Sequence, residues 1–376
     1  MRILVAPDKF RGTLTARQAA EAFATGWRRT RPGDELDLVP MADGGEGTMD
    51  TLVDALGGER VRVRVPGPLG DPVDAAYGMV PGVAGGTGVI EMSAASGLSR
   101  LAEGRRDPMR TTTAGTGALI RAAIGSGARD LLVCLGGSAT NDGGTGMASA
   151  LGYRFLDAEG ALLEPGGGAL VSLARIDTVG VIPELSGVRV VGACDVDNPL
   201  TGPTGASATF GPQKGASADE VAVLDHALGH LAAVVHRDLG VAWKDEPGAG
   251  AAGGLGFGLL SFCGARLRPG VDVVMDAVGL HDRIRRADLV ITGEGSFDAQ
   301  SLHGKTPAGV LDAAKLAGVP IAIVCGRASI APEGVAVRSL VDAVGERAAM
   351  QDTRAALASV GETMAHDVGD LTGATT

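Results

Sequence analysis

The stretch DLVITGEGSFDAQSLHGKTP (288–307) contains an apolar run, a glycine-rich loop and a proline, in that order. The apolar run DLVIT (288–292) predicts a buried strand, and a proline suits the first turn of a helix. The helical segment LDAAKLAG (311–318) ends on a capping glycine, and IAIVC (321–325) predicts the next strand. The region therefore predicts a strand–loop–helix–strand unit, which is the repeating element of parallel α/β sheets.

The end of the same loop is similar to part of a phosphate-binding P-loop. Gly304-Lys305-Thr306 matches the last three positions of the pattern G-x-x-x-x-G-K-[ST], but Ala299 stands at the position of its first glycine. That glycine allows the loop to turn its amides onto phosphate. The loop therefore has components of an anion site without matching the P-loop pattern.

Apolar runs and amphipathic segments alternate along the rest of the chain. Further strands are predicted at ILVA (3–6), LDLVP (36–40), DLLVCL (130–135) and VRVVGAC (188–194), with helices over 15–31, over 46–56 and from about 143. The alternation is typical of α/β proteins, whose near-continuous apolar strands form parallel sheets covered on both faces.

The domain organisation follows from where this pattern is interrupted. RVRVRV (60–65) alternates between charged and apolar residues, so it predicts a strand with one solvated face and the start of β-rich material. We predict a doubly wound, Rossmann- or flavodoxin-like parallel sheet formed by both chain ends, residues 1–65 and 266–376. A mixed α/β domain, residues 66–265, is inserted between them.

Composition excludes several classes of function. The chain of 376 residues is 45% hydrophobic and 20% charged, which is typical of a globular protein. The formal net charge is −11 and only 3% of residues are aromatic. We therefore expect neither nucleic acid nor an anionic membrane surface as a partner, because both need basic patches and single-stranded nucleic acid also needs stacking surfaces.

The cysteines and the chain start favour a cytoplasmic protein. Cys134, Cys194, Cys263 and Cys325 are far apart in apolar runs, so we expect buried thiols in a reducing compartment. The chain begins directly with a predicted strand, so we expect no signal peptide. The uncharged segment 248–265 is too short and too rich in glycine to span a membrane, and predicts a turn followed by a buried helix.

Five acidic residues follow predicted strands closely: Asp8, Asp43, Asp142, Asp195 and Glu294. Each lies at or just beyond the carboxyl end of its strand, which is the edge where open α/β sheets bind ligands. Any single aspartate in such a place is more commonly a turn or helix-capping residue. Five of them, each close to glycines, favour a binding site assembled from several loops.

The loops also suggest phosphoryl transfer. Glycine-rich loops that open helices present free amides to phosphate, and LGGSATNDGG (135–144) has this arrangement. Acids can hold Mg²⁺ or accept a proton from an alcohol, while lysines neutralise the transferred group. Lys9, Lys214 and Lys305 lie in such loops, although each could equally be a solvated surface residue.

Two other classes of function stay open at this level. An NAD(P)-dependent oxidoreductase would need G-x-G-x-x-G after a strand, and in Gly293-Glu294-Gly295 the third glycine is replaced by Asp298. A non-catalytic nucleotide- or metabolite-binding regulator is disfavoured by the number of acids at one sheet edge. No DNA-binding appendage is visible.

Seven motifs together resemble the bacterial glycerate kinase family, of the glycerate 2-kinase type. They are APDKFRGT (6–13), ADGGEGT (42–48), GTGALI (115–120), LGGSATNDGG (135–144), CDVDNPL (194–200), FGPQKG (210–215) and TGEGSFDAQSLHGKTP (292–307). The resemblance covers nearly the whole chain. Two positions depart from the family pattern, because Lys9 stands where serine is usual and Arg11 where lysine is usual.

The resemblance implies an enzyme that transfers phosphate from ATP, with Mg²⁺, to D-glycerate. It implies two α/β domains with the active site in the cleft between them, and phosphorylation at the 2-hydroxyl, which the residues alone do not distinguish from the 3-hydroxyl. We expect a monomer or a homodimer.

Candidate site residues follow from the loops and the resemblance together. Asp195 is the preferred general base because its apolar strand would hold it rigidly, with Asp43 as the rival, and Lys305 completes the catalytic pair. The other expected roles are substrate binding by Asp8, Lys9, Arg11, Asp43, Gly44 and Gly45, nucleotide or phosphate binding by Gly136, Gly137, Ser138, Thr140, Asn141, Lys214, Gly293, Glu294 and Gly295, and metal binding by Asp142 and Asp298.

Overall fold

The computed structural model describes residues 1–10, 12–82, 85–302 and 305–372, in two compact units. Unit 1 comprises Met1–Asp43 and Gly270–Thr376, and unit 2 comprises Gly44–Pro269. The sequence placed the boundaries at 65/66 and 265/266 instead. The difference arises because the strand at 59–66 pairs along its whole length with the next strand of unit 2, so it cannot be separated from that sheet.

Unit 1 contains a five-stranded sheet in the order β13-β12-β11-β1-β2, with every neighbouring pair parallel. Its strands are β1 (Arg2–Pro7), β2 (Glu35–Leu38), β11 (Leu289–Phe297), β12 (Ile321–Ala328) and β13 (Ala336–Ser339). This is the flavodoxin-like order, in which the chain reverses direction across the sheet between β1 and β11. Ligands of such sheets bind beyond the carboxyl ends of the strands at that point.

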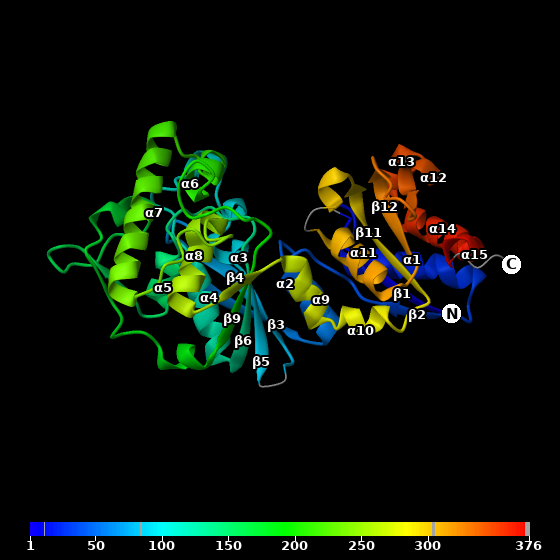
Figure 1. Ribbon diagram of the computed structural model, residues 1–376, viewed down its shortest axis with the longest axis horizontal. Coiled ribbons are helices and arrows are strands. Elements are labelled where there is room, and N and C mark those ends of the chain that lie inside the picture. The colour runs from blue at the N-terminus through cyan, green and yellow to red at the C-terminus, as the bar shows by residue number, and fades with distance from the viewer. Residues whose placement is uncertain (11, 83–84, 303–304, 373–376) are drawn as a thin grey trace. The chain divides into compact units, whose positions relative to one another are not determined.

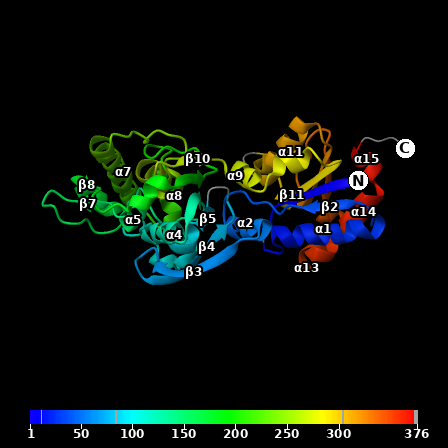
Figure 2. The ribbon, with the colours of Figure 1, turned by 90° about the horizontal axis from the view of Figure 1, so that it is seen from below.

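Helices cover both faces of this sheet (Figures 1 and 2). They are α1 (Ala16–Thr30), α9 (Gly270–Ala277), α10 (Leu280–Ile284), α11 (Thr306–Ala317), α12 (Leu340–Val344), α13 (Glu346–Gln351), α14 (Thr353–His366) and α15 (Val368–Thr372). In Figure 2, α11 lies above the strands of the unit, and α1 and α14 lie below them. A capping box between Thr15 and Gln18 starts α1, and its buried Phe23 and Trp27 belong to the same apolar cluster as Leu357 of α14.

Unit 2 contains a six-stranded mixed sheet in the order β10-β9-β6-β5-β4-β3 and a separate hairpin. The sheet strands are β3 (Glu59–Pro66), β4 (Pro72–Val80), β5 (Gly86–Glu91), β6 (Ala128–Cys134), β9 (Arg189–Ala193) and β10 (Arg266–Arg268), and the hairpin strands are β7 (Arg154–Leu156) and β8 (Arg175–Asp177). β3 and β4 are antiparallel additions to an otherwise parallel sheet. As the alternating sequence predicts, the arginines of β3 are exposed and its valines are at least partly buried.

The helices of unit 2 are α2 (Thr48–Leu56), α3 (Ser93–Ser96), α4 (Ala114–Gly125), α5 (Thr145–Ala150), α6 (Ala206–Phe210), α7 (Ala218–Leu239) and α8 (Ala251–Cys263). The first residues of α8 form the expected turn, because Ala252, Gly253 and Gly254 all adopt left-handed backbone angles. The rest of α8 is buried almost throughout, also as expected. Within the described ranges, no helix is both long and apolar enough to cross a membrane.

The α/β fold class is confirmed, while two details differ from the sequence-based expectation. Cys134 and Cys325 are buried, but Cys194 and Cys263 are partly exposed. The expected strand at 288–292 continues to Phe297, because Ser296 and Phe297 pair with Arg327 and Ala328 of β12. Glu294 therefore lies within a strand, not in the loop after one.

Candidate active site

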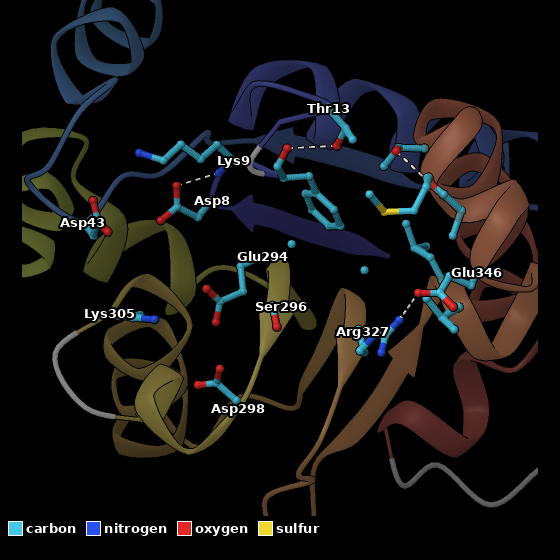
Figure 3. Close-up of a pocket in the computed structure, with 18 residues that line it drawn as sticks. Asp8, Lys9, Thr13, Asp43, Glu294, Ser296, Asp298, Lys305, Arg327 and Glu346 are labelled. Atoms are coloured by element: carbon cyan, nitrogen blue, oxygen red, sulfur yellow. Dashed lines mark hydrogen bonds and ion pairs between the residues drawn. The ribbon is translucent and has the colours of Figure 1, made fainter. Parts of the chain in front are cut away.

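A cavity of about 390 Å³ lies at the carboxyl ends of β1, β11 and β12 in unit 1 (Figure 3). Its charged lining includes Asp8, Lys9, Asp43, Glu294, Asp298, Lys305, Arg327 and Glu346. The structure thus brings together residues for which the sequence predicted catalytic, substrate-binding, nucleotide-binding and metal-binding roles. A pocket with a few convergent charged groups at this edge of the sheet is where a ligand is expected.

Asp8 is held rigidly at the end of β1. Its side chain is only 6% exposed, and its carboxylate accepts hydrogen bonds from the Lys9 amide (2.6 Å) and the Thr306 hydroxyl (2.8 Å). Burial, together with the nearby Asp43 carboxylate, raises the pKa of Asp8 to about 6 against the opposing hydrogen bonds. Asp8 therefore gains and loses a proton within the range useful to an enzyme near neutral pH.

Glu294 projects from β11 into the same cavity (Figure 3). Its Oε1 atom is buried and has no hydrogen-bond partner among the described residues. Burial raises the pKa of Glu294, the Ser301 hydroxyl and the Lys305 ammonium oppose that rise, and the Asp8 and Asp298 carboxylates add to it. A buried oxygen without a partner costs free energy unless a ligand completes its coordination, so Glu294 marks a place for a bound group.

Lys305 and Asp298 lie on either side of a short connection before α11. Lys305 occupies the N-cap position of α11, and Pro307 lies in the first turn, as the sequence predicted. The Asp298 carboxylate accepts the Gln300 amide (2.9 Å) and the Ser301 amide (3.3 Å), so it also anchors its own turn. No cluster of three or more histidine, cysteine or acidic side chains with metal-binding geometry occurs in the described residues.

The two glycines of β11 have a role in strand packing. A Cβ atom at Gly293 would lie 1.7 Å from the Val324 carbonyl oxygen of β12, so only glycine allows this approach of the two strands. Gly295 lines the cavity, whereas Gly293 accepts the Asp8 amide through its carbonyl (2.8 Å). Because Gly293 to Gly295 are extended strand, they do not form the tight turn that a dinucleotide fingerprint requires.

The loop 135–144 lies in unit 2 and is mostly buried. Gly136 and Gly137 reach the surface, while Ser138, Thr140 and Asn141 are buried. The amides of Ala139, Gly143 and Gly144 donate within unit 2, and the helix that follows, α5, has only six residues. The expected phosphate contacts are therefore sterically accessible only at Gly136 and Gly137.

Asp142 is the anchor of that loop. It is fully buried, and its carboxylate accepts hydrogen bonds from the amide (2.8 Å) and hydroxyl (2.9 Å) of Thr113 and from the amides of Gly144 (3.1 Å) and Gly146 (3.1 Å). These donors occupy most of the lone pairs that a cation would need. The geometry therefore supports a structural role for Asp142 in place of the expected metal binding.

Lys214 and Asp195 complete the candidates in unit 2. Lys214 is 1% exposed, its ammonium donates to the Thr140 carbonyl oxygen (2.8 Å), and burial lowers its pKa to about 7. It is thus enclosed by protein and does not present its charge to a phosphate. Asp195 follows β9 as expected and is exposed.

Two expected substrate-binding residues, Gly44 and Gly45, do not line the cavity, and a third, Arg11, lies outside the described residues. Gly44 and Gly45 follow Asp43 directly and belong to unit 2. Sequence reasoning in turn missed Thr306 as the partner of Asp8, and missed the wall formed by α12, α13 and α14. Thr306 was visible as the last residue of the partial P-loop pattern, whereas nothing in the sequence connected the C-terminal helices to a site.

Comparison with known proteins identifies the family. The description "Glycerate kinase family" applies to a sequence profile that matches residues 3–372. The chain belongs to the glycerate kinase family. It is 51% identical over 329 residues to glycerate kinase of Bacillus subtilis (strain 168), covering 88% of this chain and 86% of the relative. It is 46% identical over 326 residues to glycerate 2-kinase of Escherichia coli (strain K12), covering 87% and 85%.

A solved structure supports the same assignment. The crystal structure of a putative glycerate kinase 2 from Salmonella typhimurium LT2 aligns with a TM-score of 0.91 and 42% identity, over 98% of each chain. The resemblance drawn from the seven motifs is thereby confirmed, as is the expectation of a kinase. The oxidoreductase and regulator alternatives are set aside for a member of this family.

Proposed function

We propose that this protein transfers the γ-phosphoryl group of ATP to the 2-hydroxyl of D-glycerate, giving 2-phosphoglycerate and ADP. The observation that carries the proposal is the cavity of unit 1, where two lysines and five carboxylates surround one space at the carboxyl edge of a parallel sheet. Family membership supports the kinase class, and the name of the Escherichia coli relative, glycerate 2-kinase, supports the choice of hydroxyl.

Lys9 and Lys305 are the residues we assign to the transferred phosphoryl group. Both line the cavity and come from different segments, the first after β1 and the second before α11. In the transition state negative charge is spread over the three equatorial oxygens of the transferred group, and phosphoryl transfer depends mainly on electrostatic stabilisation of that charge and on positioning. Lys9 and Arg11 are also our candidates for the glycerate carboxylate, since arginine can bind a carboxylate through two hydrogen bonds.

Asp8 is the general base that the cavity supports best. It lines the cavity, its orientation is fixed by the Lys9 amide and the Thr306 hydroxyl, and its pKa of about 6 leaves it largely ionised at neutral pH. Asp195, the base preferred from the sequence, lies in unit 2 and stays a prediction that a substitution can test. Asp43 lines the same cavity and remains the second candidate.

Glu294 and Asp298 are the residues we assign to Mg²⁺. Carboxylate oxygens are its preferred protein ligands, and it is commonly held by one or two carboxylates together with substrate phosphates. The unpartnered buried oxygen of Glu294 fits this requirement, as does the position of Asp298 beside it at the cavity wall. Mg²⁺ held by these two carboxylates would supply positive charge that offsets the negative charge of the phosphates during transfer.

Three further proposals concern unit 2, the location of the protein and its oligomeric state. Gly136 and Gly137 are the residues of unit 2 that we propose for phosphate contacts. We also infer a cytoplasmic location and a monomer or homodimer.

A coupled assay tests the proposal. Purified protein is incubated with ATP, Mg²⁺ and D-glycerate, and the product is passed to enolase, which consumes 2-phosphoglycerate but not 3-phosphoglycerate. We expect ADP formation and an enolase signal without added phosphoglycerate mutase, and loss of both when Mg²⁺ is chelated. An enolase signal that appears only with added mutase would show that the 3-hydroxyl is phosphorylated. The absence of glycerate-dependent ADP formation would refute the proposed kinase activity.

A further inference from the structure

The cavity of unit 1 extends well beyond its charged end. Glycerate has one carboxylate, two hydroxyls and almost no apolar surface, so contact with apolar side chains would not stabilise its binding. The far part of the cavity is nevertheless lined by the apolar side chains of Phe10, Leu340, Val341, Ala349 and Met350. Its volume of about 390 Å³ falls within the range of pockets that enclose larger ligands.

This apolar end is a built feature of the fold. Leu340 is fully buried and Phe10 and Ala349 are 2% and 4% exposed, so they form a fixed base. Met350, in contrast, is 65% exposed although it lines the cavity. An exposed methionine beside a fixed apolar base offers a flexible, polarisable surface that can close on a flat aromatic ring.

Two of the residues that line the cavity on β11 and β12 are glycines. Gly295 of β11 and Gly326 of β12 both line the cavity, and a Cβ atom at Gly326 would lie 2.3 Å from the Gly295 carbonyl oxygen. The two strands therefore meet at bare backbone here. A planar group can approach such a surface more closely than it could approach any larger residue.

Charge orients a ligand along the cavity. In Figure 3, Asp8, Lys9, Asp43 and Lys305 lie on one side, while Arg327 and Glu346 lie on the other. Arg327 and Glu346 form an ion pair that joins β12 to α13 at the apolar end. With Mg²⁺ held by Glu294 and Asp298 as proposed above, a molecule with an anionic end and an aromatic end would place its anionic end at the lysines and its ring near α13.

We propose that the purine ring of the nucleotide binds in the apolar end of this cavity, between Phe10 and Met350, with its phosphates directed toward Lys9 and Lys305. The proposal rests on the function proposed above, since it identifies the aromatic ligand as the base of the phosphoryl donor. It places the base against the C-terminal helices α12 and α13. The phosphates then lie at the loops that hold Lys9 and Lys305.

Methyl NMR tests the location of the base directly. The methionine methyl groups are labelled with ¹³C, the Met350 signal is assigned with Met350→Leu, and MgADP or inorganic tripolyphosphate is then added. We expect MgADP to shift the Met350 signal and tripolyphosphate to leave it in place, because only the nucleotide carries a ring. A Met350 signal that does not move at saturating MgADP would overturn the proposal.

A matched pair of variants gives the energetic test. Met350→Asp is expected to raise the Kd for MgADP about tenfold, while the KM for glycerate stays within twofold. Leu316→Asp is the control, because Leu316 is 90% exposed in the same unit and does not line the cavity. If both variants bind MgADP equally well and the wild-type protein phosphorylates glycerate, the proposed base site is refuted but the proposed kinase function is not. Conversely, Met350-dependent MgADP binding without glycerate turnover would refute the proposed function alone.

Discussion

Replacing Asp8 by asparagine is expected to make the protein more stable and much less active. The carboxylate of Asp8 is buried, and asparagine can keep both of its contacts, since its Oδ1 can accept the Lys9 amide and its Nδ2 can donate to the Thr306 hydroxyl. The substitution therefore removes a buried charge without leaving a partner unsatisfied. If Asp8 accepts the glycerate proton, kcat should fall by about 10²–10⁴.

The expected gain in stability follows from the pKa of Asp8. Its rise from 3.8 to about 6 corresponds to about 3 kcal/mol at about 1.36 kcal/mol per pH unit. Between those two pH values the folded state keeps a proton that the unfolded state has released, so the stability of the wild type falls as pH rises through this window. Asparagine does not titrate. The free energy of unfolding of the variant should therefore exceed that of the wild type by about 3 kcal/mol at pH 8 and by roughly half of that at pH 5. The difference should be close to zero below about pH 4.

Differential scanning calorimetry of both proteins at pH 5 and pH 8 provides the measurement. For a unit of this size, about 3 kcal/mol corresponds to a rise in Tm of roughly 6–12 °C in the transition of unit 1. Hydrogen exchange of β1 peptides identifies which transition belongs to that unit. A gain in Tm that is the same at both pH values, or no gain at all, would show that Asp8 is not a destabilising buried charge and would refute this reasoning.

Four further substitutions test individual assignments. Thr306→Val removes a hydrogen bond that favours the Asp8 carboxylate, so the acidic limb of the kcat/KM–pH profile should move to higher pH; an unmoved limb would separate that limb from Asp8. Asp195→Asn should retain kcat within a few-fold if Asp8 is the base, whereas a loss of about 10²–10⁴ in a folded variant would restore Asp195 to that role. Lys214→Met should leave the Kd for MgADP within twofold but lower the Tm, since its ammonium is enclosed against Thr140; a large loss of affinity would show a phosphate contact. Arg11→Ala should raise the KM for glycerate more than that for ATP, and an unchanged glycerate KM would remove Arg11 from the substrate site.

Apolar runs and strand–helix alternation were sufficient to predict the fold class. The buried strands of unit 1 are short apolar runs that alternate with helical segments, and helix ends such as Thr15 and Gly318 carry ordinary capping residues. The length of β11 was not predictable in the same way. Its extension through Gly293–Phe297 depends on pairing with β12, and glycine is read as a turn residue when the neighbouring strand is unknown.

The candidate site was predicted in part for a similar reason. Of the five acids predicted at strand ends, Asp8, Asp43 and Glu294 line the cavity of unit 1. The sequence could not distinguish them from Asp142, which also follows a strand and precedes glycines. The carboxylate of Asp142 instead accepts hydrogen bonds inside unit 2. The wall formed by Met350 and its neighbours depends on tertiary packing of helices far along the chain, which no local pattern reports.

A crystal structure of the protein with D-glycerate, Mg²⁺ and a non-hydrolysable ATP analogue tests the central claim most directly. We predict that the analogue occupies the cavity of unit 1, with its base beside Met350, its phosphates at Lys9 and Lys305, and a glycerate hydroxyl within hydrogen-bond distance of Asp8. A nucleotide bound instead at Gly136 and Gly137 of unit 2, with the unit 1 cavity holding neither phosphate nor base, would contradict the account.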